Sequence, residues 1–152
     1  MNTLIDRATS RSMTLLSIAT GVLIGAATLG ALLSGQTGAA AFSAAIGALI
    51  GGALWVFSAL EIEVTDAHVE ARFRALARKK LTWAEIASVE AAPYRFTEFW
   101  GWGLRWSLRG NEAYSVIGVP GSVRITLQSG RVVVLSALHP NVVAEAIQRH
   151  LG

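Results

Sequence analysis

The sequence predicts an α+β protein in which a hairpin of two transmembrane helices precedes a β-rich domain closed by a C-terminal helix. Two observations support this fold class. No charged residue or histidine occurs from Ser12 to Leu60, whereas all but three of the charged side chains lie beyond that run. From Glu61 onward, polar and apolar residues alternate as in half-buried strands. The abrupt change in composition indicates a change of solvent, and it divides the chain into residues 1–60 and 61–152.

The uncharged run contains two segments, at about residues 13–33 and 39–60, that are long enough to cross a bilayer. A helix needs about 20 apolar residues to do so. The short polar stretch between them, residues 34–38, suits a tight reversal. We therefore expect two antiparallel spans in a multi-pass membrane protein. A cleaved signal peptide is the alternative, although the first segment is longer than the apolar region of about 7–15 residues that such peptides contain.

Basic residues flank these segments on one side only. Arg7 and Arg11 precede the first segment, a group of five follows the second, and the reversal has none. Because Lys and Arg are enriched in cytoplasmic loops, we expect both termini in the cytoplasm and the protein in the cell (inner) membrane.

Small residues recur at a spacing of four in both segments. They are Gly21 and Gly25 in the first, and Ser43, Gly47 and Gly51 in the second. This spacing places small side chains on one face of a helix, where they allow close helix–helix packing. The general abundance of glycine in membrane helices explains the pattern equally well.

Short alternating segments make up the second half of the chain. Four of them predict an antiparallel meander. They cover residues 61–65, 68–74, 78–82 and 88–91, with a helical turn at 83–86. Four more predict two hairpins. These pair 103–108 with 112–118, and 122–128 with 131–136. Seven to eight antiparallel strands are expected in all.

A helix is predicted to follow Pro140, since proline suits the first turn of a helix. Apolar residues then recur at helical spacing. They are Val142, Val143, Ala146, Ile147 and Leu151.

Several framework segments resemble the bacterial pleckstrin-homology-like (PH-like) domains that are attached to one or two membrane spans. The points of likeness are Val64-Thr65-Asp66, Leu81–Val89, Trp100–Arg105, Ala113–Val116, Val123–Leu127, Ser129-Gly130-Arg131 and His139-Pro140. The resemblance covers residues 61–151. It implies a β-sandwich or partly open barrel with a C-terminal helix, and it carries over no catalytic or ligand-binding set.

Five cations lie close together after the second apolar segment, with no acid among them. They are Arg72, Arg74, Arg78, Lys79 and Lys80. Near a bilayer, each such residue gains about 1 kcal/mol from anionic headgroups, so lipid contact is one interpretation. The other is a solvated hairpin tip that fixes topology, because acids such as Glu61 and Glu70 would offset much of its field.

The densest aromatic segment alternates along one face if it is extended. Its members are Trp100, Trp102, Leu104, Trp106 and Leu108. We expect Trp106 and Leu108 in the core, and Trp100 and Trp102 at a lipid interface or against a partner.

No enzyme, metal or nucleic-acid signature stands out. The chain lacks cysteine, and its net charge of +3 is dispersed. His68, His139 and His150 lie on different predicted elements without the spacing of metal ligands. We therefore expect a protein with no catalytic residues, no cofactor, no metal and no nucleic-acid partner.

Three functional hypotheses follow. The first is a non-enzymatic module, held in the lipid bilayer, that docks a membrane-protein partner or a second copy at the cytoplasmic face. The second is a domain that engages anionic lipids through residues 72–80 with Trp100 and Trp102. The third is an enzyme whose site leaves no motif in the sequence.

Overall fold

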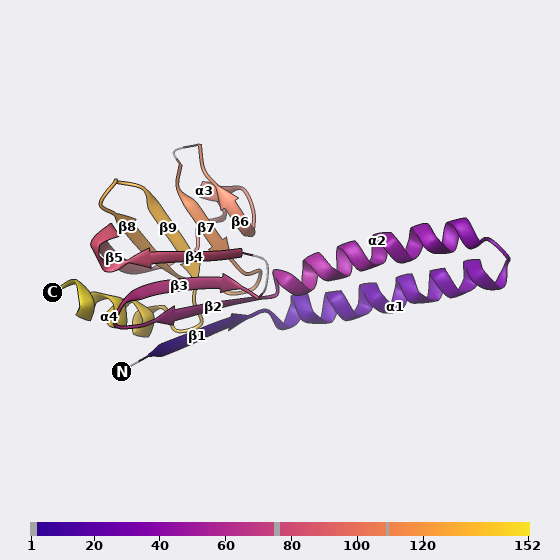
Figure 1. Cartoon of the computed structure of the whole chain (residues 1–152), viewed down its shortest axis with the longest axis horizontal. Coiled ribbons are helices and arrows are strands. Elements are labelled where there is room, and N and C mark those ends of the chain that lie inside the picture. Colours follow the sequence, from indigo (N-terminus) through magenta and orange to yellow (C-terminus); the bar gives the residue numbers. More distant parts are fainter. Residues whose placement is uncertain (1–2, 75–76, 109) are drawn as a thin grey trace.

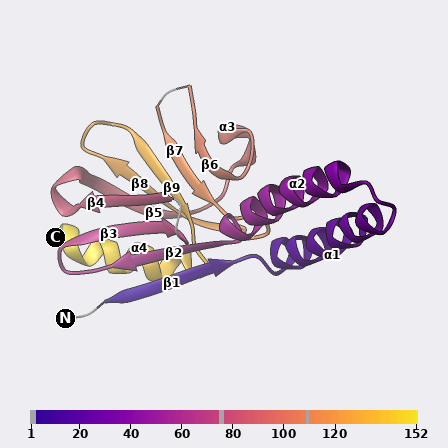
Figure 2. The ribbon, with the colours of Figure 1, turned by 45° about the vertical axis from the view of Figure 1, so that its right-hand side comes forward.

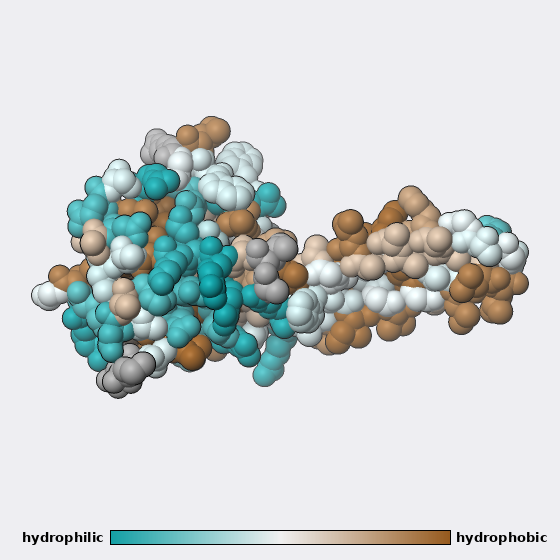
Figure 3. Space-filling view, viewed as in Figure 1, coloured by the Kyte–Doolittle hydropathy of each residue, from teal (hydrophilic) through white to brown (hydrophobic). Residues whose placement is uncertain are grey.

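The computed structural model describes residues 3–74, 77–108 and 110–152. Helices α1 (Arg11–Leu33) and α2 (Thr37–Val56) project as an antiparallel hairpin from a β domain that holds both ends of the chain (Figure 1). Both helices are long and apolar enough to cross a membrane, and almost none of their residues is buried. A core helix would be mostly buried, so this exposure fits helices that are covered by lipid. Figure 3 shows the contrast between the apolar hairpin and the polar β domain.

The first sheet has the strand order β1-β2-β3-β4. Its strands are β1 (Leu4–Thr9), β2 (Ala59–Val64), β3 (His68–Phe73) and β4 (Ala77–Thr82). β1 precedes the helical hairpin and pairs along its whole length with β2, which follows it. No strand was predicted before the first span, and residues 1–60 were expected to form an N-terminal segment and the helical hairpin. The first sheet contains strands from both sides of the hairpin.

The second sheet has the order β5-β8-β9-β7-β6. Its strands are β5 (Ile86–Pro93), β6 (Gly103–Trp106), β7 (Glu112–Ser115), β8 (Gly121–Leu127) and β9 (Val132–Ser136). Both predicted hairpins, β6–β7 and β8–β9, are confirmed. The described residues therefore contain nine strands, where seven to eight were expected.

Two predictions about strand pairing are wrong. Residues 88–91 do not complete the meander, because the 3-10 turn Trp83–Glu85 carries the chain across to the second sheet, where β5 pairs with β8. β7 and β9 are parallel, although all strands were expected to be antiparallel. β9 lies between β8 and β7, so the edge of β9 that is not used in the β8–β9 hairpin pairs with β7. The two sheets share no strand pairing in the described residues, so they do not close into a barrel.

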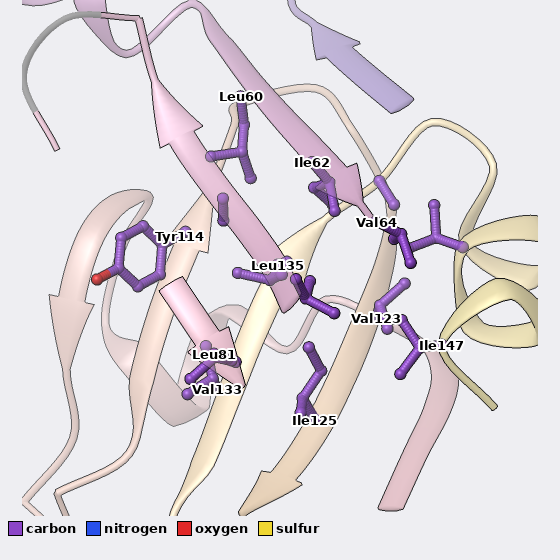
Figure 4. Close-up of a cluster of buried hydrophobic side chains, with 14 of the residues drawn as sticks. Leu60, Ile62, Val64, Leu81, Tyr114, Val123, Ile125, Val133, Leu135 and Ile147 are labelled. Carbon is purple, nitrogen blue, oxygen red and sulfur yellow. The ribbon is translucent and has the colours of Figure 1, made fainter. Parts of the chain in front are cut away.

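One apolar core lies between the sheets and helix α4 (Pro140–Leu151) (Figure 4). Alternate residues of β2 and β8 point into it, including Ile62, Val123 and Ile125, which are fully buried. The predicted C-terminal helix is confirmed, and it buries Val143 and Ile147. Val142 was expected on the same face but is exposed, since it lies beside that face rather than on it.

The hairpin and the β domain are joined at a compact junction, which we call the helix end of the β domain (residues 10–13 and 55–58; Figure 2). The Ser10 N–H donates to the Ser58 carbonyl at 2.9 Å, which ties the entry of α1 to the exit of α2. The Ser10 hydroxyl caps α1 by accepting from the Met13 N–H at 3.1 Å. Phe57 packs edge-on against Phe73, with ring centroids 5.2 Å apart. These contacts fix where the two helices leave the domain.

Candidate interaction surfaces

The predicted cation cluster is spread along the β3–β4 hairpin. Arg72 and Arg74 lie at the helix end of the β domain, because β3 runs toward it and Arg74 follows the last residue of β3. Arg78, Lys79 and Lys80 lie on β4, which runs away from that end. The sequence interpretation placed all five at one hairpin tip. In the structure Arg78 stands opposite Arg72 in the β3–β4 register, whereas Lys79 and Lys80 lie progressively farther along β4.

Acidic neighbours offset the cations of β4. The Arg78 Nε lies 2.8 Å from a Glu70 carboxylate oxygen, and the Lys79 Nζ lies 2.9 Å from Glu112. Lys80 stands opposite Glu70 in the β3–β4 register. The field of this strand is therefore weaker than its sequence suggests.

A hollow of about 340 Å³ opens beside the helix end, between β1, β2, β3 and the last turn of α2. Its charged lining comes from three strands that place Arg7, Glu61 and Arg72 side by side in register. The Glu61 carboxylate accepts from Arg72 Nη2 at 2.7 Å and from Arg7 Nε at 3.1 Å. The hydrogen bond from Arg72, followed by the charge of Arg7, lowers the pKa of Glu61. Glu61 thus stays ionised and holds both arginines at the hollow.

Arg74 and Trp55 complete this hollow on its helical side. The Arg74 guanidinium lies 4.2 Å from the centroid of the Trp55 ring, a cation–π arrangement. Arg74 reaches it from a backbone with φ of 38°, which is uncommon for a residue other than glycine. The strained backbone and the ring together hold the cation close to the exit of α2.

A second hollow, of about 320 Å³, lies at the other flank of the helix end. Met13 from α1 and Phe57 from the exit of α2 line it together with Trp102 and Arg105. Trp102 is 40% exposed and packs against Phe96, with ring centroids 4.5 Å apart. The structure therefore places Trp102 beside the helical hairpin, although it is distant from both helices in sequence.

Exposed aromatic side chains gather around α3 (Phe96–Phe99) and the β6–β7 hairpin, and we call them the aromatic surface. It comprises four aromatic residues and one leucine: Phe96 and Trp102, whose rings pack together, and Trp100, Trp106 and Leu108, which line one hollow. Trp100 is 84% exposed and Trp106 is 64% exposed. The prediction that Trp106 and Leu108 lie in the core is wrong, because β6 ends at Trp106 and forms the edge of its sheet.

A rigid framework supports the aromatic surface from below. Glu98 on α3 accepts two hydrogen bonds from Arg124 on β8, at 2.8 and 2.9 Å. This pairing lowers the pKa of Glu98 and raises the pKa of Arg124. The Tyr94 hydroxyl donates to the Gly101 carbonyl at 2.6 Å. Phe99, the last residue of α3, is buried. A hollow of about 800 Å³, lined in part by Trp100, lies next to this framework.

The predicted small residues of the hairpin fall into two groups. Gly47 lies directly against Ile24, and the Gly51 carbonyl accepts from the Ser17 hydroxyl at 3.3 Å, so these positions face α1. Ser43 lies on the same partly buried face of α2.

The other two glycines, Gly21 and Gly25, have open space beside them. A Cβ added at either would meet no atom within 4 Å. Both line an apolar groove of about 520 Å³ along the two helices, and Gly47 of α2 lines the same groove.

The histidines are scattered across the β domain, each with a different carboxylate. His68 lies near Glu70, His139 near Asp6 and His150 near Asp66. Among the described residues, no group of three histidine or acidic side chains is arranged to hold a metal ion.

Searches of protein-family models, of curated proteins and of solved structures found no match to this chain. The functional conclusion therefore depends on the surfaces described above.

Two members of these surfaces escaped the sequence analysis as binding residues. Arg7 was considered only as a flanking charge, and Trp55 only as part of an apolar span. The position of Trp55 near the end of that span was the available signal, because indole rings are enriched where a span meets the headgroups. The role of Arg7 depends on β1, which the sequence analysis did not predict.

Proposed function

We propose that this chain is a non-enzymatic docking module. In this proposal α1 and α2 anchor it in the cell membrane as a multi-pass protein, and a PH-like β domain at the cytoplasmic face binds a membrane-protein partner. The pairing of β1 with β2 supports the anchoring, because it requires the chain to enter and leave the hairpin on the same side. The arginines that flank the hairpin favour the cytoplasm for that side.

The aromatic surface is the observation that carries this proposal. Large apolar side chains are normally scattered over a protein surface, and a contiguous group of them marks an interaction site. Tryptophan is also the residue most enriched among those that dominate binding energy at interfaces. Trp100 has positive φ (52°) and is mostly exposed, and the Glu98–Arg124 pair beneath it holds α3 in place. A rigid, exposed indole is well suited to enter a pocket on a partner.

A photocrosslinking experiment tests this proposal. A benzoylphenylalanine placed at Phe96 in the full-length, membrane-embedded protein should yield a discrete protein adduct. Combining it with Trp100→Ala and Trp106→Ala should remove that adduct, whereas Ile5→Ala, an exposed position on β1 in the other sheet, should leave it unchanged. An adduct of twice the monomer mass would identify a second copy as the partner. Absence of any protein adduct in several detergents and in membranes would contradict the proposal.

A second candidate function, engagement of the lipid surface, is favoured by the position of Trp102 beside Met13 and Phe57. An indole at that level would lie among the headgroups if α1 and α2 span the bilayer. The same photocrosslinker placed at Trp102 distinguishes the two functions. Adducts with lipid alone would support this second function, and adducts with protein alone would exclude it at this residue.

A further inference from the structure

The hollow between Arg7, Arg72, Arg74 and Trp55 has an excess of positive charge and unused hydrogen-bond donors. Glu61 is the only acid that lines it, among the residues that the structure describes there. Both oxygens of that carboxylate are engaged by Arg7 and Arg72. A guanidinium has more N–H groups than these contacts use, so each arginine can still donate to a ligand.

The charge and shape of this hollow suit a phosphate group. Arginine binds phosphate through its planar fork of donors, and it is preferred over lysine where such recognition matters. All three cations here are arginines, and Glu61 has already fixed two of them. The volume of about 340 Å³ lies near the lower end of the range for small-molecule sites. It suits a headgroup rather than a large ligand.

The position of the hollow favours the headgroup of a phospholipid. Trp55 belongs to the last turn of α2, and its ring forms one wall of the hollow. If α2 crosses a bilayer, this turn lies at the level of the lipid phosphates. Positively charged residues close to a span are the usual contacts of anionic headgroups.

Choline would find little to bind in this hollow. Its quaternary ammonium would need a free carboxylate or an open aromatic face. Glu61 is occupied by two arginines, and the Arg74 guanidinium lies over one face of the Trp55 ring, where it would repel a second cation. The hollow should therefore distinguish anionic lipids from zwitterionic ones, even though both carry a phosphate.

We infer that Arg7, Arg72, Arg74 and Trp55 form a binding site for the phosphate of one anionic phospholipid at the exit of α2. This inference rests on the proposed membrane anchoring, and it does not depend on the protein partner. It places lipid recognition at the junction between the hairpin and the sheet, where only part of the predicted 72–80 segment contributes.

The test is lipid retention by the full-length protein, measured by native mass spectrometry in detergent. Phosphatidylglycerol should be retained as one molecule per chain, and phosphatidylcholine should be lost. Arg74→Gln should weaken retention about fivefold, the change that corresponds to about 1 kcal/mol for one cation near an anionic headgroup. Combining it with Arg7→Gln should weaken retention about 25-fold if the two contributions add.

Arg78→Gln is the matched control. Arg78 stands opposite Arg72 in the β3–β4 register, but its side chain pairs with Glu70 and does not line the hollow. It should change retention less than twofold. Arg74→Lys, which keeps the charge but loses the fork, should give an intermediate result and guards against a folding defect in Arg74→Gln. Thermal melting of each variant checks that it is folded.

The outcomes separate this site from the anchoring and from soluble ligands. Equal retention by the Arg74 and Arg78 variants, or equal retention of both lipids, would overturn the site while leaving the anchoring intact. If inorganic phosphate at millimolar concentration displaces the lipid and binds as tightly as phosphatidylglycerol does, a soluble phosphate compound is the occupant. That result would overturn the lipid assignment. Failure of the wild-type chain to enter lipid nanodiscs at all would contradict the anchoring itself.

Discussion

Glu98 shows how a single carboxylate can stabilise an exposed surface that has little packing of its own. Its two hydrogen bonds to Arg124 join the short helix α3 to the central part of the second sheet. Because such charge-assisted bonds are worth more than neutral ones, they help keep α3 and the neighbouring Trp100 in place. The aromatic surface should therefore depend on the ionisation of this residue.

We predict that acid weakens this support. The pKa of Glu98 is lowered below its ordinary value of 4.5 in the folded protein. Its contribution is therefore fully present above that ordinary value, and it is lost as the pH falls through the lowered one. Glu98→Gln should reduce the free energy of unfolding by about 1–2 kcal/mol at neutral pH. The difference between wild type and variant should shrink as the pH falls below the ordinary pKa of 4.5.

Denaturant unfolding followed by tryptophan fluorescence measures this difference at each pH. Glu145→Gln is a suitable control, since Glu145 is exposed on α4. A gap between wild type and Glu98→Gln that stays constant down to acidic pH would contradict the role assigned to the ion pair.

Among the elements, β1 makes the most contacts that the sequence analysis did not predict. It supplies the outer strand of the first sheet, and it brings Asp6 to the start of α4. The buried Asp6 carboxylate accepts from the Leu138 N–H at 2.8 Å and lies 2.9 Å from His139 Nδ1. One short strand thus contacts both β2 and the loop that begins the C-terminal helix.

Deletion of residues 3–8 should therefore destabilise the whole β domain. It would leave the backbone N–H and C=O groups of β2 unpaired at a sheet edge, a known route to association, and it would remove the partner of the Leu138 N–H. We expect loss of protease resistance and a shift to larger species in size-exclusion chromatography of the detergent-solubilised protein. Ile5→Thr, which alters only an exposed side chain of β1, should change stability by less than about 0.5 kcal/mol. A deletion variant that stays monomeric and protease-resistant would show that β1 is dispensable.

The elements that sequence could predict are those with a local pattern. Val123, Ile125 and Leu127 alternate with polar residues, and the β8–β9 hairpin was predicted correctly on that basis. The two apolar helices were also predicted from a local pattern, their long runs without charge. The parallel pairing of β7 with β9 leaves no local pattern, because it depends on which edge of the β8–β9 hairpin is free.

The misplaced aromatic residues have a local explanation. Trp100, Trp102 and Trp106 alternate as a strand would, but the backbone does not continue as a strand through them. Trp100 has a φ of 52°, and Gly101 and Gly103 have φ of 145° and 91°, so the chain turns before β6 begins. For the basic segment, sequence proximity suggested one cluster, whereas β3 and β4 run in opposite directions and separate Arg74 from Lys80.

At the scale of the whole molecule, the structure constrains how the chain can lie in a membrane. Cysteine labelling can test this, because the natural chain has no cysteine. Gln36→Cys, in the reversal between α1 and α2, should react with a membrane-impermeant maleimide in intact cells. Glu145→Cys, exposed on α4, should react only after permeabilisation. The reverse pattern would place the β domain outside the cell, and labelling of both sites in intact cells would contradict a hairpin that spans the membrane.

The insertion of α1 and α2 between two neighbouring strands also orders the events of synthesis. Arg7 and Glu61 become partners although they stand 54 positions apart, so the N-terminal strand must wait, unpaired, while both helices are made. Only a hairpin that has turned back correctly returns the chain to within reach of that waiting strand. Completion of the first sheet would therefore distinguish correctly inserted molecules from the others. A molecule whose second helix failed to return would keep an unpaired sheet edge, which chaperones and proteases can recognise.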